Sequence, residues 1–246
     1  MFPKNLESPV VLEDYKNVKA VIDVVYNPSK TQILLDAERL GIPCVNGLYM
    51  LVAQAEKASA IFKGEASWKS KTEEIVSALE LEMKNIVLVG MPGCGKSTVG
   101  SSLAKALGRD FRDGDVEVKE IFGRTPAEII SEDGEDAFRK LETEALKSLC
   151  KQSGLVISTG GGCVTVKENF DVLRQNSVVV WLKRPIEELS TEGRPLSKSY
   201  EELCKMYNVR EPMYEAVSDF PVDNIGAVQD TVNAVIKETE RILKVK

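Results

Sequence analysis

The sequence predicts an α/β fold in which a parallel sheet is covered by helices. Continuous apolar runs at 86–89, 155–158 and 178–182 are typical of strands that are buried on both faces. A glycine-rich loop follows the first run and leads directly into a helical segment. Strands that alternate with helices in this way indicate parallel strands joined by crossover helices.

Apolar spacing and turn residues set the remaining elements. From residue 85 onward, helical spacing predicts helices at 96–107, about 115–122, 126–150, 166–175, 199–215 and 228–243. Before residue 85, the same signals predict strands at 18–25 and 44–46 and helices at 31–40, 47–62 and 72–82. We therefore expect three parts, which are an α/β segment at 1–63, a partly helical linker at 64–84 and a domain at 85–246.

Composition excludes several classes of function. The net charge of −6 does not favour a nucleic-acid partner or an anionic membrane surface. No run of 18 apolar residues is present, and no histidine is present to form a Ser-His-Asp triad or a histidine metal site. The five scattered cysteines form no CxxC pair, so we expect reduced thiols in a cytoplasmic protein.

The loop between the first strand and its helix matches the phosphate-binding pattern G-x-x-x-x-G-K-[ST] at Gly90, Gly95, Lys96 and Ser97. Such a loop turns its backbone N–H groups toward an anion, at the positive end of a helix. The pattern predicts that ATP contacts a run of six residues, which are Gly93, Cys94, Gly95, Lys96, Ser97 and Thr98. The motif indicates nucleotide binding alone, although the absence of an NKxD motif argues against a GTPase.

Further motifs follow downstream, and each of them, taken alone, could have a purely structural role. They are Asp113-Gly114-Asp115, Phe138-Arg139, Gly160-Gly161-Gly162, Gly193-Arg194-Pro195-Leu196 and Arg210-Glu211-Pro212-Met213-Tyr214. The two aspartates could cap a helix, and Arg139 with Glu142 could form a surface i,i+3 ion pair. The glycine run could be a plain turn. Their joint occurrence in this order is not explained by those readings.

In these motifs and their order, residues 85–246 resemble shikimate kinase over nearly the whole domain. The resemblance implies a P-loop kinase fold, with a five-stranded parallel sheet in the order 2-3-1-4-5 flanked by helices. It also implies transfer of the γ-phosphate of ATP to the 3-hydroxyl of shikimate, with Mg²⁺ as cofactor. A monomeric kinase domain is expected.

On the nucleotide side, the resemblance assigns Lys96 to the phosphates, and Ser97 and Asp113 to the magnesium ion. Arg194 resembles the lid arginine that closes over the phosphates and neutralises charge in the transition state. The segment 186–193 is shorter and more acidic than the corresponding part of the family, and the arginine that often stacks on adenine is not evident.

On the acceptor side, the resemblance assigns Arg139 and Arg210 to the shikimate carboxylate, which suits the planar fork of a guanidinium. Asp115 would accept a hydrogen bond from the attacking hydroxyl and is the candidate base. Glu142 is similar to the glutamate that orients the substrate arginine. Gly160, Gly161 and Gly162 would let the backbone approach the ring closely.

Residues 1–80 resemble the C-terminal part of shikimate dehydrogenase, through Asp23-Val24-Val25-Tyr26-Asn27-Pro28 and Gly47-Leu48-Tyr49-Met50-Leu51-Val52-Ala53-Gln54. The segment has no glycine-rich pyrophosphate loop, so we expect no dehydrogenase activity from it and expect Tyr26 and Gln54 to be idle. Docking on the kinase domain, self-association and mobility stay open for this segment.

Two other functions compete with shikimate phosphorylation. One is another small P-loop kinase, acting on gluconate or on a nucleoside monophosphate. The other is a non-catalytic nucleotide-binding subunit. Arg139, Arg210 and the triple glycine argue against the first, and the intact motif set argues against the second.

Overall fold

A computed structural model describes residues 6–64, 69–189 and 200–244 of the chain. The chain divides into two compact units, one formed by residues 1–84 with 243–246 and the other by residues 85–242. Within the described ranges, no helix is both long and apolar enough to cross a membrane. The subdivision of the first 84 residues into a segment and a linker stays a prediction.

The larger unit is built on a five-stranded parallel sheet with the order β4-β5-β3-β6-β7. Its strands are β3 (Asn85–Val89), β4 (Phe111–Asp113), β5 (Val156–Ser158), β6 (Ser177–Lys183) and β7 (Phe220–Asp223). When these strands are counted in chain order, the arrangement is 2-3-1-4-5, which confirms the predicted fold class. The short strands β4 and β7 are not among the strands whose ranges were predicted from the sequence.

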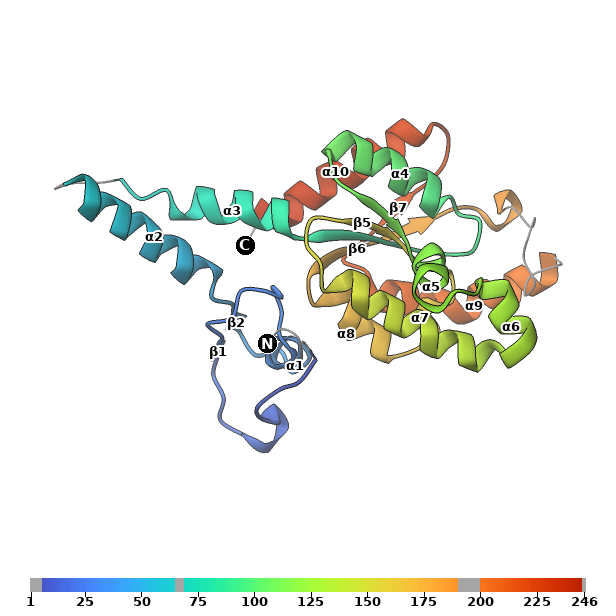
Figure 1. Ribbon diagram of the computed structural model, residues 1–246, viewed down its shortest axis with the longest axis horizontal. Coiled ribbons are helices and arrows are strands. Elements are labelled where there is room, and N and C mark those ends of the chain that lie inside the picture. The colour runs from blue at the N-terminus through green and yellow to red at the C-terminus, as the bar shows by residue number, and fades with distance from the viewer. Residues whose placement is uncertain (1–5, 65–68, 190–199, 245–246) are drawn as a thin grey trace. The chain divides into compact units, whose positions relative to one another are not determined.

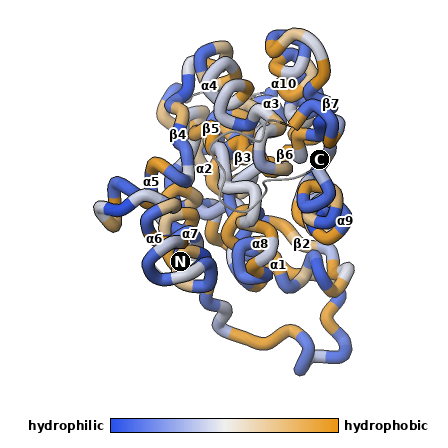
Figure 2. The backbone as a smooth tube through the Cα atoms, turned by 90° about the vertical axis from the view of Figure 1, so that its right-hand side faces the viewer, coloured by the Kyte–Doolittle hydropathy of each residue, from blue (hydrophilic) through white to orange (hydrophobic). Residues whose placement is uncertain are grey.

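Helices cover both faces of this sheet. They are α4 (Lys96–Leu107), α5 (Gly114–Phe122), α6 (Pro126–Asp133), α7 (Glu135–Cys150), α8 (Glu168–Arg174), α9 (Tyr200–Val217) and α10 (Val228–Lys244). Figures 1 and 2 show α4 and α10 on one face of the sheet and α7, α8 and α9 on the other. The central strand β3 is therefore enclosed, and all five of its residues are buried.

The predicted single helix at 126–150 is wrong, because two helices occupy that range. Gly134 has φ of 87° and ψ of 169°, which ends α6 and starts α7. The first of the two begins at a capping box, in which Thr125 and Glu128 bond each other's backbone N–H, with Pro126 as the first helical residue. Glycine is the residue that adopts this backbone conformation without a steric penalty.

Sheet register brings the functional ends of three strands together. Asp113 at the end of β4 lies opposite Ser158 at the end of β5, and Ser158 lies opposite Leu88 of β3. The phosphate loop starts two residues after Leu88. In open parallel α/β sheets, ligands bind outside the carboxyl ends of the strands. The candidate site is expected at this edge.

In residues 6–64 and 69–84, the smaller unit contains a two-stranded parallel sheet and three α-helices. Its elements are the 3₁₀ turn η1 (Leu12–Asp14), β1 (Val21–Ile22), α1 (Gln32–Arg39), β2 (Cys44–Val45), α2 (Leu48–Lys63) and α3 (Thr72–Met83). The predicted strand at 18–25 is shortened to two residues, paired in register with β2. A small core of Leu12, Val21, Leu34 and Ala37 holds α1 against the strands.

Candidate active site

The phosphate loop connects β3 to α4, and Lys96 is the first residue of that helix. Gly95 has φ of 93°, a left-handed conformation that favours glycine, and this turn points the first N–H groups of α4 out of the helix end. The buried ammonium group of Lys96 donates to the carbonyl oxygens of Gly90 and Met91, at 2.9 Å each. The loop thus combines open backbone donors with a fixed positive charge.

A hydroxyl and a carboxylate meet beside this loop. Ser97 Oγ donates to Asp113 Oδ2 at 2.7 Å and lies 3.2 Å from Ser158 Oγ. The other oxygen of Asp113 accepts the backbone N–H of Asp115 at 3.0 Å, so Asp113 is also the N-cap of α5. The capping reading and the site reading of Asp113 are therefore both compatible with its position. Hard oxygen donors of this kind suit Mg²⁺.

A cavity of about 360 Å³ lies at the carboxyl edge of the sheet. Its walls come from the phosphate loop, from the end of β4 and from the end of β5. The lining residues are Pro92, Gly93, Gly95, Lys96, Ser97, Thr98, Asp113, Asp115, Ser158, Thr159, Gly160 and Gly161. The loop that holds phosphate and the glycine turn therefore share one space.

The Asp115 carboxylate is accessible from this cavity. Its pKa is raised, mainly because the surrounding walls displace bulk water and secondarily because the Asp113 carboxylate is close. The positive charges of Lys96 and Arg139 act in the opposite direction. A carboxyl group with a raised pKa is a better proton acceptor than an ordinary surface aspartate.

Arg139 lies at the far side of the glycine turn, held by two carboxylates of its own helix. Its Nη1 donates to Glu142 Oε2 and its Nη2 to Glu135 Oε1, each at 2.7 Å. Glu142 is only 1% exposed, so its pair with Arg139 is a buried ion pair. The alternative of a surface i,i+3 ion pair is therefore wrong. Burial raises the pKa of Glu142, and the charge of Arg139 opposes this shift.

The glycine turn is in close contact with these charged groups. A Cβ atom at Gly160 would collide with Glu142 Oε1, and one at Gly162 would collide with the Arg139 guanidinium. Glu142 Oε1 is buried and has no hydrogen-bond partner among the described residues. From the other side, Arg210 of α9 donates to the Gly161 carbonyl at 3.1 Å. Two arginines and the buried Glu142 thus contact one short turn of backbone.

The comparisons with known proteins agree with this geometry. A family model described as shikimate kinase matches residues 92–240. The chain belongs to the shikimate kinase family. The predicted resemblance to shikimate kinase is thereby confirmed over residues 92–240, while the bounds 85–246 of the domain stay a prediction.

Individual members of the family cover the same part of the chain. A shikimate kinase of Clostridium botulinum (strain Alaska E43 / Type E3) is 38% identical over 167 residues, which are 65% of this chain and 98% of that protein. The shikimate kinase of Acinetobacter baumannii (strain AYE) is 35% identical over 164 residues, covering 63% of this chain and 91% of that protein.

Solved structures of the family have the same fold. The shikimate kinase from Acinetobacter baumannii in complex with shikimate has a TM-score of 0.62 and 34% identity, covering 66% of this chain and 96% of that one. The shikimate kinase from Aquifex aeolicus has a TM-score of 0.57 and 31% identity, covering 63% of this chain and 96% of that one.

The structure brings most of the predicted site residues to one place, with two exceptions. Cys94 is fully buried, and its side chain does not line the cavity; its carbonyl accepts a bond from Asn224 Nδ2 at 2.7 Å. Arg194 lies outside the described residues. Gly162, Arg139 and Arg210 do not line the cavity themselves; Arg139 lies against Gly162, and Arg210 donates to the carbonyl of Gly161, which does line it.

Some residues at the site were missed by the sequence analysis. Ser158 and Thr159 line the cavity, and Glu135 holds Arg139. The signal for Ser158 was present, since a hydroxyl residue ends a buried strand immediately before a glycine run. Nothing in the sequence singled out Glu135 from the other acids of α7.

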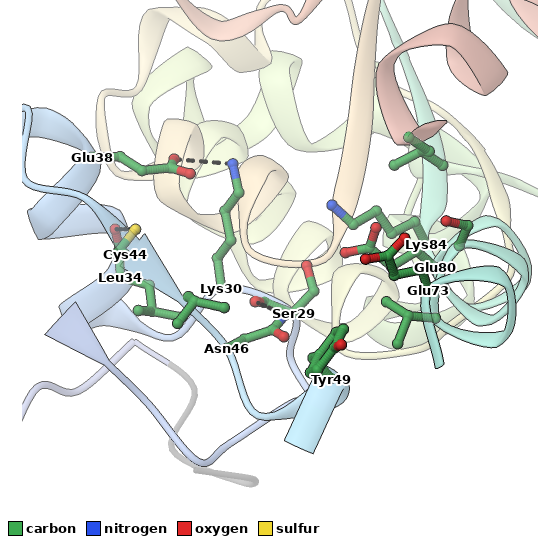
Figure 3. A pocket seen from close by; sticks show the side chains of 14 residues that line it. Ser29, Lys30, Leu34, Glu38, Cys44, Asn46, Tyr49, Glu73, Glu80 and Lys84 are labelled. Atoms are coloured by element: carbon green, nitrogen blue, oxygen red, sulfur yellow. Dashed lines mark hydrogen bonds and ion pairs between the residues drawn. The ribbon is translucent and has the colours of Figure 1, made fainter. Parts of the chain in front are cut away.

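A second, larger cavity of about 620 Å³ occurs in the smaller unit (Figure 3). Some of its polar groups interact with one another, since Lys30 pairs with Glu38 at 2.9 Å and Asn46 Nδ2 donates to the Ser29 carbonyl at 2.9 Å. The described lining contains no phosphate loop and no cluster of metal-binding side chains. The smaller cavity at the sheet edge is the candidate active site.

Proposed function

We propose that this chain transfers the γ-phosphate of ATP to the 3-hydroxyl of shikimate, forming 3-phosphoshikimate and ADP. The observation that carries the proposal is the single cavity in which the phosphate loop faces Asp115 and the glycine turn. Phosphoryl transfer depends on positioning and on charge neutralisation more than on covalent help from the protein. The lack of histidine is therefore no obstacle.

For the nucleotide, the proposal uses the loop from Gly93 to Thr98. Its N–H groups bind the phosphates, and Lys96 exchanges its bonds to loop carbonyls for phosphate oxygens. Ser97 and Asp113 would supply oxygen ligands, directly or through water, for a magnesium ion bound with the nucleotide. When bound, that ion neutralises charge on the β- and γ-phosphates. Arg194 is proposed to add positive charge from the lid.

For the acceptor, the proposal uses the groups around the glycine turn. Arg139 and Arg210 bind the shikimate carboxylate, since the two ion pairs of Arg139 use only part of its five N–H donors. Asp115 accepts a hydrogen bond from the 3-hydroxyl group and orients the hydroxyl oxygen toward the γ-phosphorus. A new bond forms between the hydroxyl oxygen and the γ-phosphorus, and the bond from the γ-phosphorus to the β,γ-bridging oxygen breaks. The hydroxyl proton passes to Asp115.

A coupled assay of ADP release tests the proposal. The purified chain with Mg·ATP is offered shikimate, gluconate or a nucleoside monophosphate at equal concentration. Turnover is expected with shikimate alone. Faster turnover with either other substrate would support the competing small-molecule kinases. ATP binding with no turnover of any acceptor would support the non-catalytic subunit.

For the smaller unit we propose kinship with the C-terminal part of shikimate dehydrogenase, without dehydrogenase activity. Support comes from the parallel pair β1–β2 joined through α1, as in half of a dinucleotide-binding fold, and from the quoted motifs. A spectrophotometric assay of NADP⁺ reduction with shikimate tests the second part. Any sustained NADPH formation by the purified chain would contradict it.

A further inference from the structure

One backbone carbonyl at the glycine turn accepts two hydrogen bonds from the same helix. The Gly161 oxygen receives the phenol O–H of Tyr214 at 2.5 Å and Nη1 of Arg210 at 3.1 Å. Both donors lie on α9, four residues apart and therefore on one helix face. The carbonyl is thus oriented by two donors that move together.

Gly161 also touches the phosphate loop. A Cβ atom at Gly161 would lie 2.6 Å from Pro92 Cδ, so the backbone of the turn packs directly against this proline. Tyr214 Oη lies 3.9 Å from the sulfur of Met91, the neighbouring loop residue. The hydroxyl of Tyr214 therefore sits where the phosphate loop and the glycine turn meet.

The Tyr214 ring cannot shift without disturbing the sheet. It is fully buried and stacks on Trp181 of β6, with ring centroids 5.9 Å apart and planes inclined by 25°. Burial raises the pKa of its phenol above the ordinary tyrosine value, so the group is protonated and can donate a hydrogen bond at neutral pH. Rigid support of this kind is what holds a site to a fraction of an ångström.

We infer that Tyr214 is a positioning residue, which sets the spacing between the glycine turn and the phosphate loop through the Gly161 carbonyl. This inference rests on the proposed function. With this spacing fixed, the acceptor hydroxyl is held at the correct distance from the γ-phosphate. Arg210 is likewise held in position to bind the shikimate carboxylate. Misplacement by a fraction of an ångström slows transfer without weakening ATP binding.

The competing reading is that Tyr214 is only a core residue. Tyr214→Phe separates the two, because it removes one oxygen and keeps the ring, the stacking on Trp181 and the burial. We expect kcat to fall and KM for shikimate to rise, by about 3- to 10-fold each, as one hydrogen bond is lost at the site. KM for ATP is expected to stay within about twofold, since no phosphate contact changes.

A matched control exists on the same helix. Tyr207 donates its hydroxyl to Glu211 at 2.8 Å and does not contact the glycine turn. Tyr207→Phe removes the same atom and is expected to leave all three kinetic constants unchanged. A second measurement is ligand-dependent melting, where the rise in Tm with saturating shikimate should shrink in Tyr214→Phe while the rise with Mg·ATP is retained.

The outcomes distinguish the inference from the function on which it rests. If the unaltered chain does not phosphorylate shikimate, the proposed function fails. If it does, and Tyr214→Phe has unchanged constants, the positioning role alone fails. The role also fails if the variant loses stability and weakens both substrates equally, because a core defect has no preference for the acceptor.

Discussion

Ser97 and Asp113 are 16 residues apart in the chain, yet the Ser97 hydroxyl donates a 2.7 Å hydrogen bond to the Asp113 carboxylate. Ser97 is the second residue of α4 and Asp113 ends β4, and Ser158 at the end of the intervening strand lies 3.2 Å from the same hydroxyl. The sheet therefore builds an oxygen-rich corner next to the phosphate loop.

This corner predicts a requirement for Mg²⁺. We expect EDTA to abolish turnover, and Ser97→Ala and Asp113→Asn to raise the Mg²⁺ concentration needed for half-maximal rate by about 10-fold or more, as loss of a metal ligand does. The check is a Mg²⁺ titration at fixed ATP. Ser101→Ala, an exposed hydroxyl of the same helix, serves as control and should titrate like the unaltered chain.

The position of Asp115 in the cavity predicts that its substitution abolishes most of the turnover. Asp115→Asn should lower kcat by at least about 100-fold, as removal of a general base does, while ATP affinity is unchanged. Asp110, five residues earlier in the chain, is exposed and serves as the control. Asp110→Asn should have the same kcat and ATP affinity as the unaltered chain. Stopped assays with each variant and a nucleotide-binding titration provide the measurement.

The sign of the pH dependence follows from the raised pKa of Asp115. The carboxylate is the active form, so kcat/KM for shikimate should be highest at neutral pH and fall as the pH drops through a pKa above the ordinary aspartate range. A rate that stays flat down to the usual range of a surface aspartate would contradict a raised pKa of Asp115 in the working enzyme.

The ion pairs of Arg139 predict that the planar shape of its guanidinium group, as well as its charge, is needed to bind shikimate. Arg139→Lys keeps the positive charge but loses the fork that bonds Glu135, Glu142 and a carboxylate together, so KM for shikimate should rise by about 10-fold or more. Arg112→Lys is the control, because Arg112 forms only a 3.7 Å surface ion pair with Glu120. This substitution should leave KM for shikimate unchanged. Equal effects of the two substitutions would contradict the assignment of Arg139.

The contact of Gly161 with Pro92 predicts that no side chain is tolerated there. In Gly161→Ala, the added methyl group would lie 2.6 Å from Pro92 Cδ and must push the turn away from the loop. Such overpacking costs about 1–3 kcal/mol of stability, and turnover should fall with it. Gly108→Ala meets nothing within 4 Å and strains only the end of α4, so it should lower Tm and leave turnover intact.

The division of the chain predicts that the kinase does not need the smaller unit. The family model covers residues 92–240, and the Clostridium botulinum shikimate kinase matches 98% of its own length to 65% of this chain. A chain that begins at residue 85 is expected to keep kcat and both KM values within about threefold. A loss of turnover in a folded, ATP-binding protein would assign the first 84 residues a role in the reaction.

The sequence indicated the phosphate loop, the acids at 113 and 115 and the two arginines, because the kinase motifs are local and ordered along the chain. It did not predict ranges for β4 and β7, whose three and four residues are too short to show a period. It also joined α6 to α7, because Gly134 interrupts the helical spacing by a single residue whose φ of 87° is not visible in a pattern.

By itself, the sequence predicted the fold class, the family and a set of candidate site residues, because the type and order of its motifs carry the resemblance to shikimate kinase. Only the tertiary structure decided which residues act as a unit. Parallel register set Asp113 beside Ser158, burial turned an i,i+3 pair at Arg139 and Glu142 into an enclosed one, and α9 brought Tyr214 onto the carbonyl of Gly161. Residues 53 apart meet there because helices pack across the sheet, and no local pattern encodes that distance.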